Sequence, residues 1–316
     1  MKILITGSGG FVGEYLIQEL LMRNHEVYGT VKSSVPKPLF PVYDLNILDD
    51  FAVESVIKTT RPDVLIHLAA QSMVLKSWEN PKDTLLVNTI GTSNLLSAII
   101  KYSPGTKIIS IGSSEEYGIT AKNGIELNEE MPCVPQNPYA LSKYSAGLLT
   151  LQLAKKNHLK AIHVRAFNHF GPGQREGFVV SDFASQIAKI EKNNFRPYLS
   201  VGDLSAVRDF TDVRDVAKAY VLLVEKDVEN GIYNVCSNKP VAVQEILNEL
   251  IHLSNVTIDV NVDEAKFRPA EVPFFVGNNT KLMVSTGWKP ERSLKESLKE
   301  TLESWRQRVI GGEYEA

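Results

Sequence analysis

Tyr139 and Lys143 are the residues whose types and spacing point most directly to chemistry. Pro138 precedes them, proline is favoured at the first position of a helix, and apolar residues continue at helical spacing, so we predict a helix to about Asn157. Residues four apart share one helix face, so the phenol lies beside the ammonium. A free tyrosine has a pKa of about 10, and an adjacent positive charge lowers it, so the pair could exchange a proton at neutral pH.

The same spacing is common on ordinary helix surfaces, so a function for the pair depends on a third residue. Ser113 follows a predicted buried strand at 107–111, and ligands of doubly wound sheets bind at the carboxyl ends of the strands. Across a bound carbonyl, Ser113 would donate a hydrogen bond to the oxygen where negative charge develops, and Tyr139 would supply or take the proton. Lys143 would lower the pKa of the tyrosine and hold a nicotinamide ribose. These three residues predict a site for hydride transfer.

The N-terminal half alternates short apolar strands with helices. We predict strands at 2–6, 26–31, 42–45, 63–68, 107–111 and 161–166, and helices at 11–22, 49–60, 83–101 and 138–157. Continuous apolar strands separated by helices indicate a parallel sheet that is covered on both faces. The predicted fold class is therefore α/β, with a doubly wound parallel Rossmann sheet.

The strict alternation fades near residue 170, where a smaller lobe is expected to begin. We predict helices at 177–192, 247–253 and 294–309, strands at 198–202 and 232–235, and a helix that ends at 225. The predicted organisation is a dinucleotide-binding Rossmann domain at residues 1–170, joined by about 211–236. An interleaved C-terminal α/β lobe at residues 171–210 and 237–316 is expected to bind the substrate.

A glycine-rich turn lies between the first predicted strand and the first predicted helix. It contains Gly7, Gly10 and Gly13, with Phe11 and Val12 between the last two. Glycines at this spacing allow a tight turn, close approach of a pyrophosphate and close packing of the helix, whose N-terminus then meets the negative charge. Because the turn follows a strand and opens a helix, it predicts a dinucleotide-binding loop.

The end of the second predicted strand bears on the choice of cofactor. NAD-binding units normally carry an acid there for the ribose hydroxyls, and an acid would repel a 2′-phosphate. This chain has Lys32 with hydroxyl residues on both sides. We therefore predict NADP(H), with NAD(H) as the alternative if Lys32 is only a solvated loop lysine.

The composition argues against several other classes of protein. The 316 residues are 43% hydrophobic and carry a formal net charge of -3, which gives no general attraction to nucleic acid or acidic membranes. Cys133 and Cys236 form neither a metal-ligand spacing nor a disulfide framework. No apolar run is long enough to span a bilayer. We therefore expect a soluble cytoplasmic protein without a metal site.

Together these motifs resemble the extended short-chain dehydrogenase/reductase family over essentially the whole chain. The matching stretches are Gly7-x-x-Gly10-x-x-Gly13, Asp44-Leu45, His67-Leu68-Ala69-Ala70, the serine at the strand end, Tyr139-x-x-x-Lys143 and Arg165-Ala166-Phe167-Asn168-His169. The resemblance implies Asp44 and Leu45 at the adenine, Leu68, Ala69 and Ala70 along the cofactor groove, His169 near the nicotinamide and Asn168 near the substrate phosphates. The remaining histidines show no partner pattern and are assigned no role.

Charged residues of the C-terminal half suggest a nucleotide diphosphate ligand. They are Lys189, Arg208, Arg268 and Glu271. Arginine suits bidentate binding of phosphate, and Glu271 could accept hydrogen bonds from a ribose or a guanine edge. Surface salt bridging is the alternative for each. The loop around Arg268 and the stretch 202–212 resemble those of GDP-mannose 4,6-dehydratases and GDP-4-keto-6-deoxy-mannose reductases, which implies a GDP-linked keto-deoxy sugar.

The residues after Ser113 separate two enzymatic alternatives. Dehydratases place a glutamate two residues after the catalytic hydroxyl, and Glu115 occupies that position. They also carry an arginine pair after the second strand, where this chain has Lys32 and Ser33. The segment around Ser113 looks closer to the reductases, and Ser114 and Glu115 are expected to contact the sugar.

The predicted activity is NADPH-dependent reduction of the C4 ketone of GDP-4-keto-6-deoxy-D-mannose to GDP-D-rhamnose. A GDP-mannose 4,6-dehydratase is the enzymatic alternative. A catalytically silent NADP-binding regulator is the non-enzymatic one, although a binding module needs no tuned acid such as Tyr139. The face of C4 that receives the hydride is not determined by these residues.

A homodimer is also expected. The predicted helices at 83–101 and 138–157 carry many apolar residues. Members of the resembled family often pair these helices in a four-helix interface. Simple coverage of the sheet by the same faces is the alternative.

Overall fold

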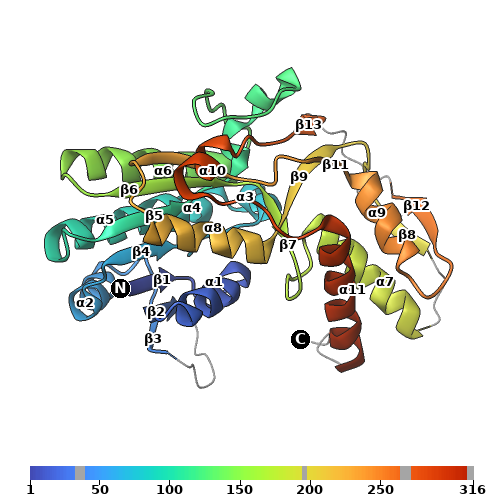
Figure 1. The fold of residues 1–316 in the computed structure, drawn as a ribbon, viewed down its shortest axis with the longest axis horizontal. Helices are drawn as coiled ribbons and strands as arrows, with labels where there is room; N and C mark the ends of the chain where they lie inside the picture. Colours follow the sequence, from blue (N-terminus) through green and yellow to red (C-terminus); the bar gives the residue numbers. More distant parts are fainter. Residues whose placement is uncertain (33–39, 194–197, 264–271, 312–316) are drawn as a thin grey trace.

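A computed structural model of the chain describes residues 1–32, 40–193, 198–263 and 272–311. Seven parallel strands form its central sheet (Figure 1). In spatial order they are β10 (Gly231–Val235), β6 (Ala161–Ala166), β5 (Lys107–Ile111), β4 (Val64–His67), β1 (Lys2–Thr6), β2 (Glu26–Val31) and β3 (Val42–Asp44). The order reverses beside β1, so the sheet is doubly wound and the predicted fold class is confirmed.

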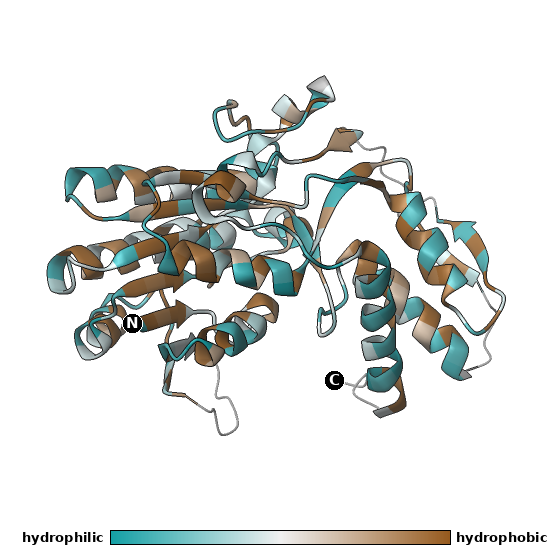
Figure 2. Ribbon diagram, viewed as in Figure 1, coloured by the Kyte–Doolittle hydropathy of each residue, from teal (hydrophilic) through white to brown (hydrophobic). Residues whose placement is uncertain are grey.

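Helices cover both faces of this sheet. They are α1 (Phe11–Met22), α2 (Asp50–Thr60), α5 (Gly91–Tyr102), α6 (Pro138–Lys156) and α8 (Val213–Glu225). Successive side chains of a strand point to opposite faces: Ile3 and Ile5 share a core with α1 and α8, whereas Leu4 packs with α2, α5 and α6. Figure 2 shows the apolar strands between helices whose outer faces are hydrophilic. Each face of the sheet therefore packs against helices to form an apolar core.

The helix predicted at 83–101 is confirmed, but its period changes within it. It runs without a break through α4 (Pro81–Leu85), the π-helical turn η1 (Leu86–Ile90) and α5, and a separate short helix, α3 (Val74–Glu79), precedes it. Within the wide turn, the buried Asn88 side chain donates to the carbonyl of Gln71 (2.9 Å) and to Oγ of Ser142 on α6 (2.9 Å). A buried amide requires such partners, and apolar spacing cannot reveal this local change of period. The turn ties this segment to the helix that carries Tyr139.

A smaller lobe lies beyond the carboxyl ends of the parallel strands (Figure 1). Its elements are β7 (Asn168–Phe170), α7 (Val179–Asn193), β8 (Tyr198–Val201), β9 (Val207–Asp212), β11 (Pro240–Ala242), α9 (Val243–His252), β12 (Asp259–Val262), β13 (Phe274–Phe275) and α11 (Leu294–Gly311). Helices α7, α9 and α11 share a second apolar core with β8 and β9. Helix α10 (Thr280–Thr286) returns to the first core, and the 3-10 turns η2 (Ser114–Tyr117) and η3 (Ile119–Asn123) follow β5.

The chain crosses between the two cores more than once. β7 continues directly from β6 and pairs with β9 of the smaller lobe, while α8 and β10 return to the sheet. The carboxyl ends of β4, β5 and β6 therefore face the smaller lobe. Within the described ranges, no helix combines the length and the apolar character needed to cross a bilayer.

Candidate active site

Tyr139 lies in the first turn of α6, and local capping fixes this helix start. Pro138 occupies the first helical position, and Oδ1 of Asn137 accepts from the backbone N–H of Ala140 (2.8 Å). The other end of the same amide, Nδ2 of Asn137, donates to Oε2 of Glu115 (3.1 Å). The start of α6 is thus tied to the turn that follows β5, which carries Ser113.

Ser113 stands at the N-terminus of η2, immediately after β5. Its Oγ accepts from the backbone N–H of Glu115 (3.2 Å), and the Glu116 carboxylate accepts from the backbone N–H of Ser113 (2.9 Å), which completes a capping box. The Ser113 side chain lies close enough to the phenol of Tyr139 to lower its pKa. Because one lone pair of Oγ is used by the N–H of Glu115, the hydroxyl hydrogen is available to the phenol or to a ligand oxygen. The structure therefore brings the two predicted groups together.

Burial determines the pKa values of the two titratable groups. It raises the pKa of Tyr139 to about 12, although the nearby Ser113 side chain opposes this shift. Burial lowers the pKa of Lys143 to about 8, against the charge of Glu116. The predicted lowering of the Tyr139 pKa by Lys143 is wrong for this structure, in which the ammonium donates to the carbonyl of Ile111 (2.7 Å). The spacing shows that the two residues share a helix face, but it does not show how deeply that face is buried. The phenol is neutral at pH 7 and holds a proton.

The glycine loop is shaped for close approach at its backbone. Gly7 has a φ of 72°, and a Cβ there would lie 2.7 Å from the backbone nitrogen of Ala69. A Cβ at Gly13 would lie 2.3 Å from the carbonyl oxygen of Ser8. Gly10 is the N-cap of α1 and offers no side chain to the first amides of the helix. These amides can receive a pyrophosphate, so the loop fits the predicted dinucleotide.

His169 lies against this loop. Its ring stacks on that of Phe11 with centroids 6.2 Å apart and an interplanar angle of 9°, and its Nδ1 is 3.0 Å from the carbonyl oxygen of Phe167. Burial lowers the pKa of His169, so the ring is neutral at pH 7. Val12, half-buried, follows Phe11 in α1. His169 therefore lies next to the glycine loop, and its predicted place near the nicotinamide stays a prediction.

The residues predicted at the adenine end meet at the carboxyl ends of β2 and β3. Val31 pairs with Asp44, and the backbone N–H of Leu45 donates to the carbonyl of Val31 (2.8 Å). Lys32 and Asp44 are exposed, whereas Leu45 is buried. Lys32 is therefore exposed one residue beyond β2, and its predicted contact with a 2′-phosphate stays a prediction.

The segment after β4 completes the wall of this groove. It contains Leu68, Ala69 and Ala70, all half-buried. The backbone N–H of Leu68 donates to the carbonyl of Thr6 (3.1 Å), and Ala69 directly faces Gly7. The backbone of Ala69 therefore packs closely on the glycine loop, with no room for a side chain at Gly7.

Arg208 links the site near Ser113 to the smaller lobe. Burial lowers the pKa of its guanidinium, and the carboxylates of Glu115 and Asp203 act in the opposite direction. The guanidinium also lies 6.0 Å from the centre of the Phe275 ring. A partly buried cation between two carboxylates suits a diphosphate bridging the two lobes.

The remaining predicted substrate residues occupy different environments. Ser114 is buried beside Ser113, and Asn168 is exposed on β7. Nζ of Lys189 forms an ion pair with Glu176 (2.6 Å). Arg268 and Glu271 lie outside the described residues.

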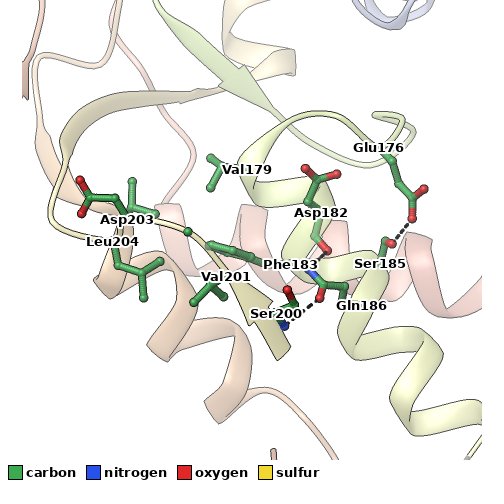
Figure 3. Close-up of a pocket in the computed structure, with 12 residues that line it drawn as sticks. Glu176, Val179, Asp182, Phe183, Ser185, Gln186, Ser200, Val201, Asp203 and Leu204 are labelled. Carbon is green, nitrogen blue, oxygen red and sulfur yellow. Dashed lines mark hydrogen bonds between the residues drawn. The ribbon is translucent and has the colours of Figure 1, made fainter. Parts of the chain in front are cut away.

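A cavity of about 530 Å³ opens in the smaller lobe between α7, β8 and the loop that follows β8 (Figure 3). Its apolar walls include Val179, Phe183 and Leu204, and the carboxylates of Asp182 and Asp203 lie at its edge. The hydrogen bond between Ser200 and Gln186 supports its floor (3.1 Å). A flat apolar group with hydrogen-bond donors on its rim matches this lining.

Sequence reasoning missed three titratable residues beneath Ser113. Glu116, His163 and Arg165 are buried together, although 47 or more positions separate Glu116 from the other two. The spacing Ser113-x-x-Glu116 is a capping-box pattern and could have identified Glu116. Nothing local to His163 or Arg165 predicts their contact with it, because that contact depends on the pairing of β5 with β6.

A dinucleotide loop and a Ser–Tyr–Lys set on a doubly wound sheet define the short-chain dehydrogenase/reductase class. The family described as "GDP-mannose 4,6 dehydratase" matches residues 4–301. This chain therefore belongs to that family, and the predicted resemblance is confirmed.

Individual relatives extend over nearly the whole chain. GDP-6-deoxy-D-mannose reductase of Pseudomonas aeruginosa is 36% identical over 314 residues, or 98% of each chain. GDP-6-deoxy-D-talose 4-dehydrogenase of Aggregatibacter actinomycetemcomitans is 31% identical and covers 90% of each. The solved structure of RMD from Pseudomonas aeruginosa complexed with NADPH superposes with a TM-score of 0.86 at 32% identity, covering 98% of this chain and 99% of that one. All three match this chain over 90% or more of their length, and the solved structure shares its fold.

Proposed function

We propose that this protein is an oxidoreductase that uses NADPH to reduce the C4 ketone of GDP-4-keto-6-deoxy-D-mannose to GDP-6-deoxy-D-mannose (GDP-D-rhamnose). The observation that carries the proposal is the meeting of the Ser113 turn and the first turn of α6, which carries Tyr139, at the carboxyl edge of the sheet, where Asn137 ties the two turns together. Likeness to a reductase of this substrate class supports it. So does likeness to a structure that contains NADPH.

The chemistry divides between the cofactor and three side chains. Bound NADPH supplies a hydride to the ketone carbon. The Ser113 hydroxyl donates a hydrogen bond to the ketone oxygen and stabilises the negative charge that develops there. Tyr139, neutral at pH 7 because burial raises its pKa to about 12, gives its proton to the resulting alkoxide. Lys143 holds the nicotinamide ribose.

The substrate extends from this edge into the smaller lobe. The sugar lies at Ser113 and Tyr139, and the diphosphate lies at Arg208. Two carboxylates act on this arginine: Glu115 at the sugar end of the substrate, and Asp203 at the nucleotide end. The guanine occupies the cavity that Asp203 borders (Figure 3). Carboxylate oxygens there can accept from the ring N–H and amino group of guanine.

Two further reactions fit particular observations. Glu115 lies beside the Asn137 cap of α6, where a base for dehydration would stand, so a GDP-mannose 4,6-dehydratase is the second candidate. The likeness to GDP-6-deoxy-D-talose 4-dehydrogenase makes the C4 epimer of the product the third. The proton and the hydrogen-bond donor supplied by Tyr139 and Ser113 suit all three reactions, so the substrate and the product decide between them.

Two parallel assays separate these candidates. With GDP-4-keto-6-deoxy-D-mannose, we expect stoichiometric oxidation of NADPH, and with GDP-mannose alone we expect no reaction. Conversion of GDP-mannose without net consumption of the nicotinamide would establish the dehydratase instead. Proton NMR of the reduced sugar distinguishes the mannose from the talose configuration at C4. No oxidation of NADPH with a pool of keto sugar nucleotides would point to a silent binding protein.

Lys32→Asp tests the choice of cofactor. An aspartate would repel the 2′-phosphate and accept from the ribose hydroxyls, so the ratio of kcat/KM for NADPH to that for NADH should fall about tenfold to a hundredfold. Lys156→Asp, an exposed substitution at the far end of α6, is the control and should leave the ratio unchanged. An unaltered ratio in Lys32→Asp would show that Lys32 is a solvated loop residue.

We also propose a homodimer through the face formed by α3, η1 and α6. Its exposed apolar side chains are Leu75 (50%), Trp78 (60%), Ile90 (47%), Leu141 (47%) and Leu148 (39%). Helix α3 packs beside α6, so these side chains lie on one face. Clustered exposed apolar side chains of this kind mark interaction surfaces.

A further inference from the structure

A buried ionic cluster lies beneath the Ser113 turn and takes no part in the proton and hydride transfers described above. Its centre is Glu116, which is 0% exposed. The carboxylate accepts from the backbone N–H of Ser113 (2.9 Å) and from Nε of Arg165 (3.2 Å). Nε2 of His163 lies 3.0 and 3.1 Å from its two oxygens. Burial alone would raise the pKa of Glu116, but these partners lower it, so the side chain is an anion.

The cluster connects the elements that carry the reacting groups. His163 and Arg165 come from β6, and Glu116 comes from the turn after β5. A Cβ at Gly147 of α6 would lie 2.4 Å from Nε2 of His163, and one at Gly112 would lie 2.2 Å from Oε1 of Glu116. Both positions therefore have no room for a side chain. Helix α6, with Tyr139 in its first turn, packs directly on the imidazole.

Stability alone does not account for this arrangement. Apolar residues of similar volume often stabilise a protein as well as a buried ion cluster does, because taking charges out of water is costly. What an apolar residue at position 116 cannot provide is an acceptor for the backbone N–H of Ser113. Among the hydrogen bonds of Glu116, the bond with the N–H of Ser113 involves a residue that is proposed to contact the substrate.

We propose that Glu116 is a positioning residue that acts through Ser113. Its carboxylate holds the backbone of Ser113, while the N–H of Glu115 holds Oγ (3.2 Å), and together they direct the hydroxyl hydrogen to the ketone oxygen. The inference rests on the proposed reductase function. A displacement of about 1 Å at a reacting group costs about a hundredfold in rate, so the effect is large enough to measure.

Glu116→Asp is the most informative variant. It keeps a buried anion in the cluster but shortens the side chain by a methylene, which withdraws the acceptor from the Ser113 N–H and lengthens the contacts with His163 and Arg165. We expect kcat for the keto sugar to fall about a hundredfold, with KM and the Kd of NADPH within about twofold of the wild-type values. In a Ser113→Ala background the same change should cost less than about twofold, because the group that Glu116 positions is already absent.

Equal losses of kcat in the two backgrounds would show a general structural role and overturn the inference, as would an unchanged kcat in Glu116→Asp. Glu116→Gln is the second variant, because its amide oxygen can still accept from Ser113. We expect it to keep kcat within about tenfold of wild type. A loss as large as that of Ser113→Ala, in a folded protein, would contradict the inference. Circular dichroism and thermal unfolding report folding in each case.

Hydrogen exchange provides a readout that does not depend on turnover. The backbone N–H of Ser113 should exchange faster in Glu116→Asp than in the wild type, while the amides of α1 stay unchanged. Unchanged exchange at Ser113 would overturn the inference even if the enzyme is active. A wild-type protein that reduces no keto sugar would overturn the proposed function instead, and the exchange result would still decide the role of Glu116.

Discussion

Tyr139→Phe is expected to lower kcat for the keto sugar by about 10²–10⁴-fold, the contribution of a positioned proton donor. The substitution removes only the phenolic oxygen, and the ring keeps its buried position in the first turn of α6. Without the phenol, the alkoxide formed at C4 loses the group that protonates it, so the transition state loses stabilisation that the ground state never had. Steady-state oxidation of NADPH measures kcat, and fluorescence titration should show an NADPH Kd close to that of the wild type.

Tyr102→Phe is the matched control for this prediction. The Tyr102 hydroxyl donates to Oε2 of Glu54 (2.7 Å) on the helical layer away from the proposed site. We expect its loss to leave kcat within about twofold of the wild-type value. A Tyr139→Phe enzyme with a similarly small change would remove Tyr139 from the mechanism.

Ser113→Ala is expected to lower kcat by about 10²–10³-fold, the effect of removing one preorganised donor to a developing oxyanion. KM should change less, because the hydrogen bond to the ketone oxygen is strongest in the transition state. The variant also loses the bond from the Glu115 N–H to Oγ, which costs about 1 kcal/mol of stability.

A capping residue elsewhere separates these two effects of the serine. The Asp49 side chain caps α2 by accepting from the N–H of Ala52 (3.0 Å). Asp49→Ala should lower the stability by about 1 kcal/mol without changing kcat. If both variants lost activity in proportion to stability, Ser113 would be a structural cap and not a donor to the substrate.

The main sheet and its catalytic edge follow from local sequence patterns. The bounds predicted for β1, α1, β2, β5 and β6 agree with the structure, because an apolar run between turn residues describes a buried strand well. The meeting of Ser113 with Tyr139 also follows, since both are anchored to element ends whose positions the parallel topology determines. The residue types and their spacing were therefore sufficient to predict that Ser113 and Tyr139 lie together, and their catalytic roles stay predictions.

Features that depend on tertiary contact could not be predicted in this way. The π-helical turn exists because Asn88 reaches across to Ser142, and no pattern within 83–101 contains that partner. The short strands β7, β11 and β13 have little sequence signal of their own and exist by pairing with β9. The pKa of Tyr139 depends on burial, which the spacing from Lys143 does not reveal.

The most direct test of the account follows the hydride itself. NADPH that carries deuterium at the transferred position should convert GDP-4-keto-6-deoxy-D-mannose into a GDP-6-deoxyhexose with one deuterium at C4 for each NADPH oxidised, as read by NMR and mass spectrometry. Reduced sugar without deuterium at C4, or loss of GDP-mannose with no net oxidation of the labelled cofactor, would contradict the proposal that Ser113, Tyr139 and the nicotinamide meet at this carbonyl.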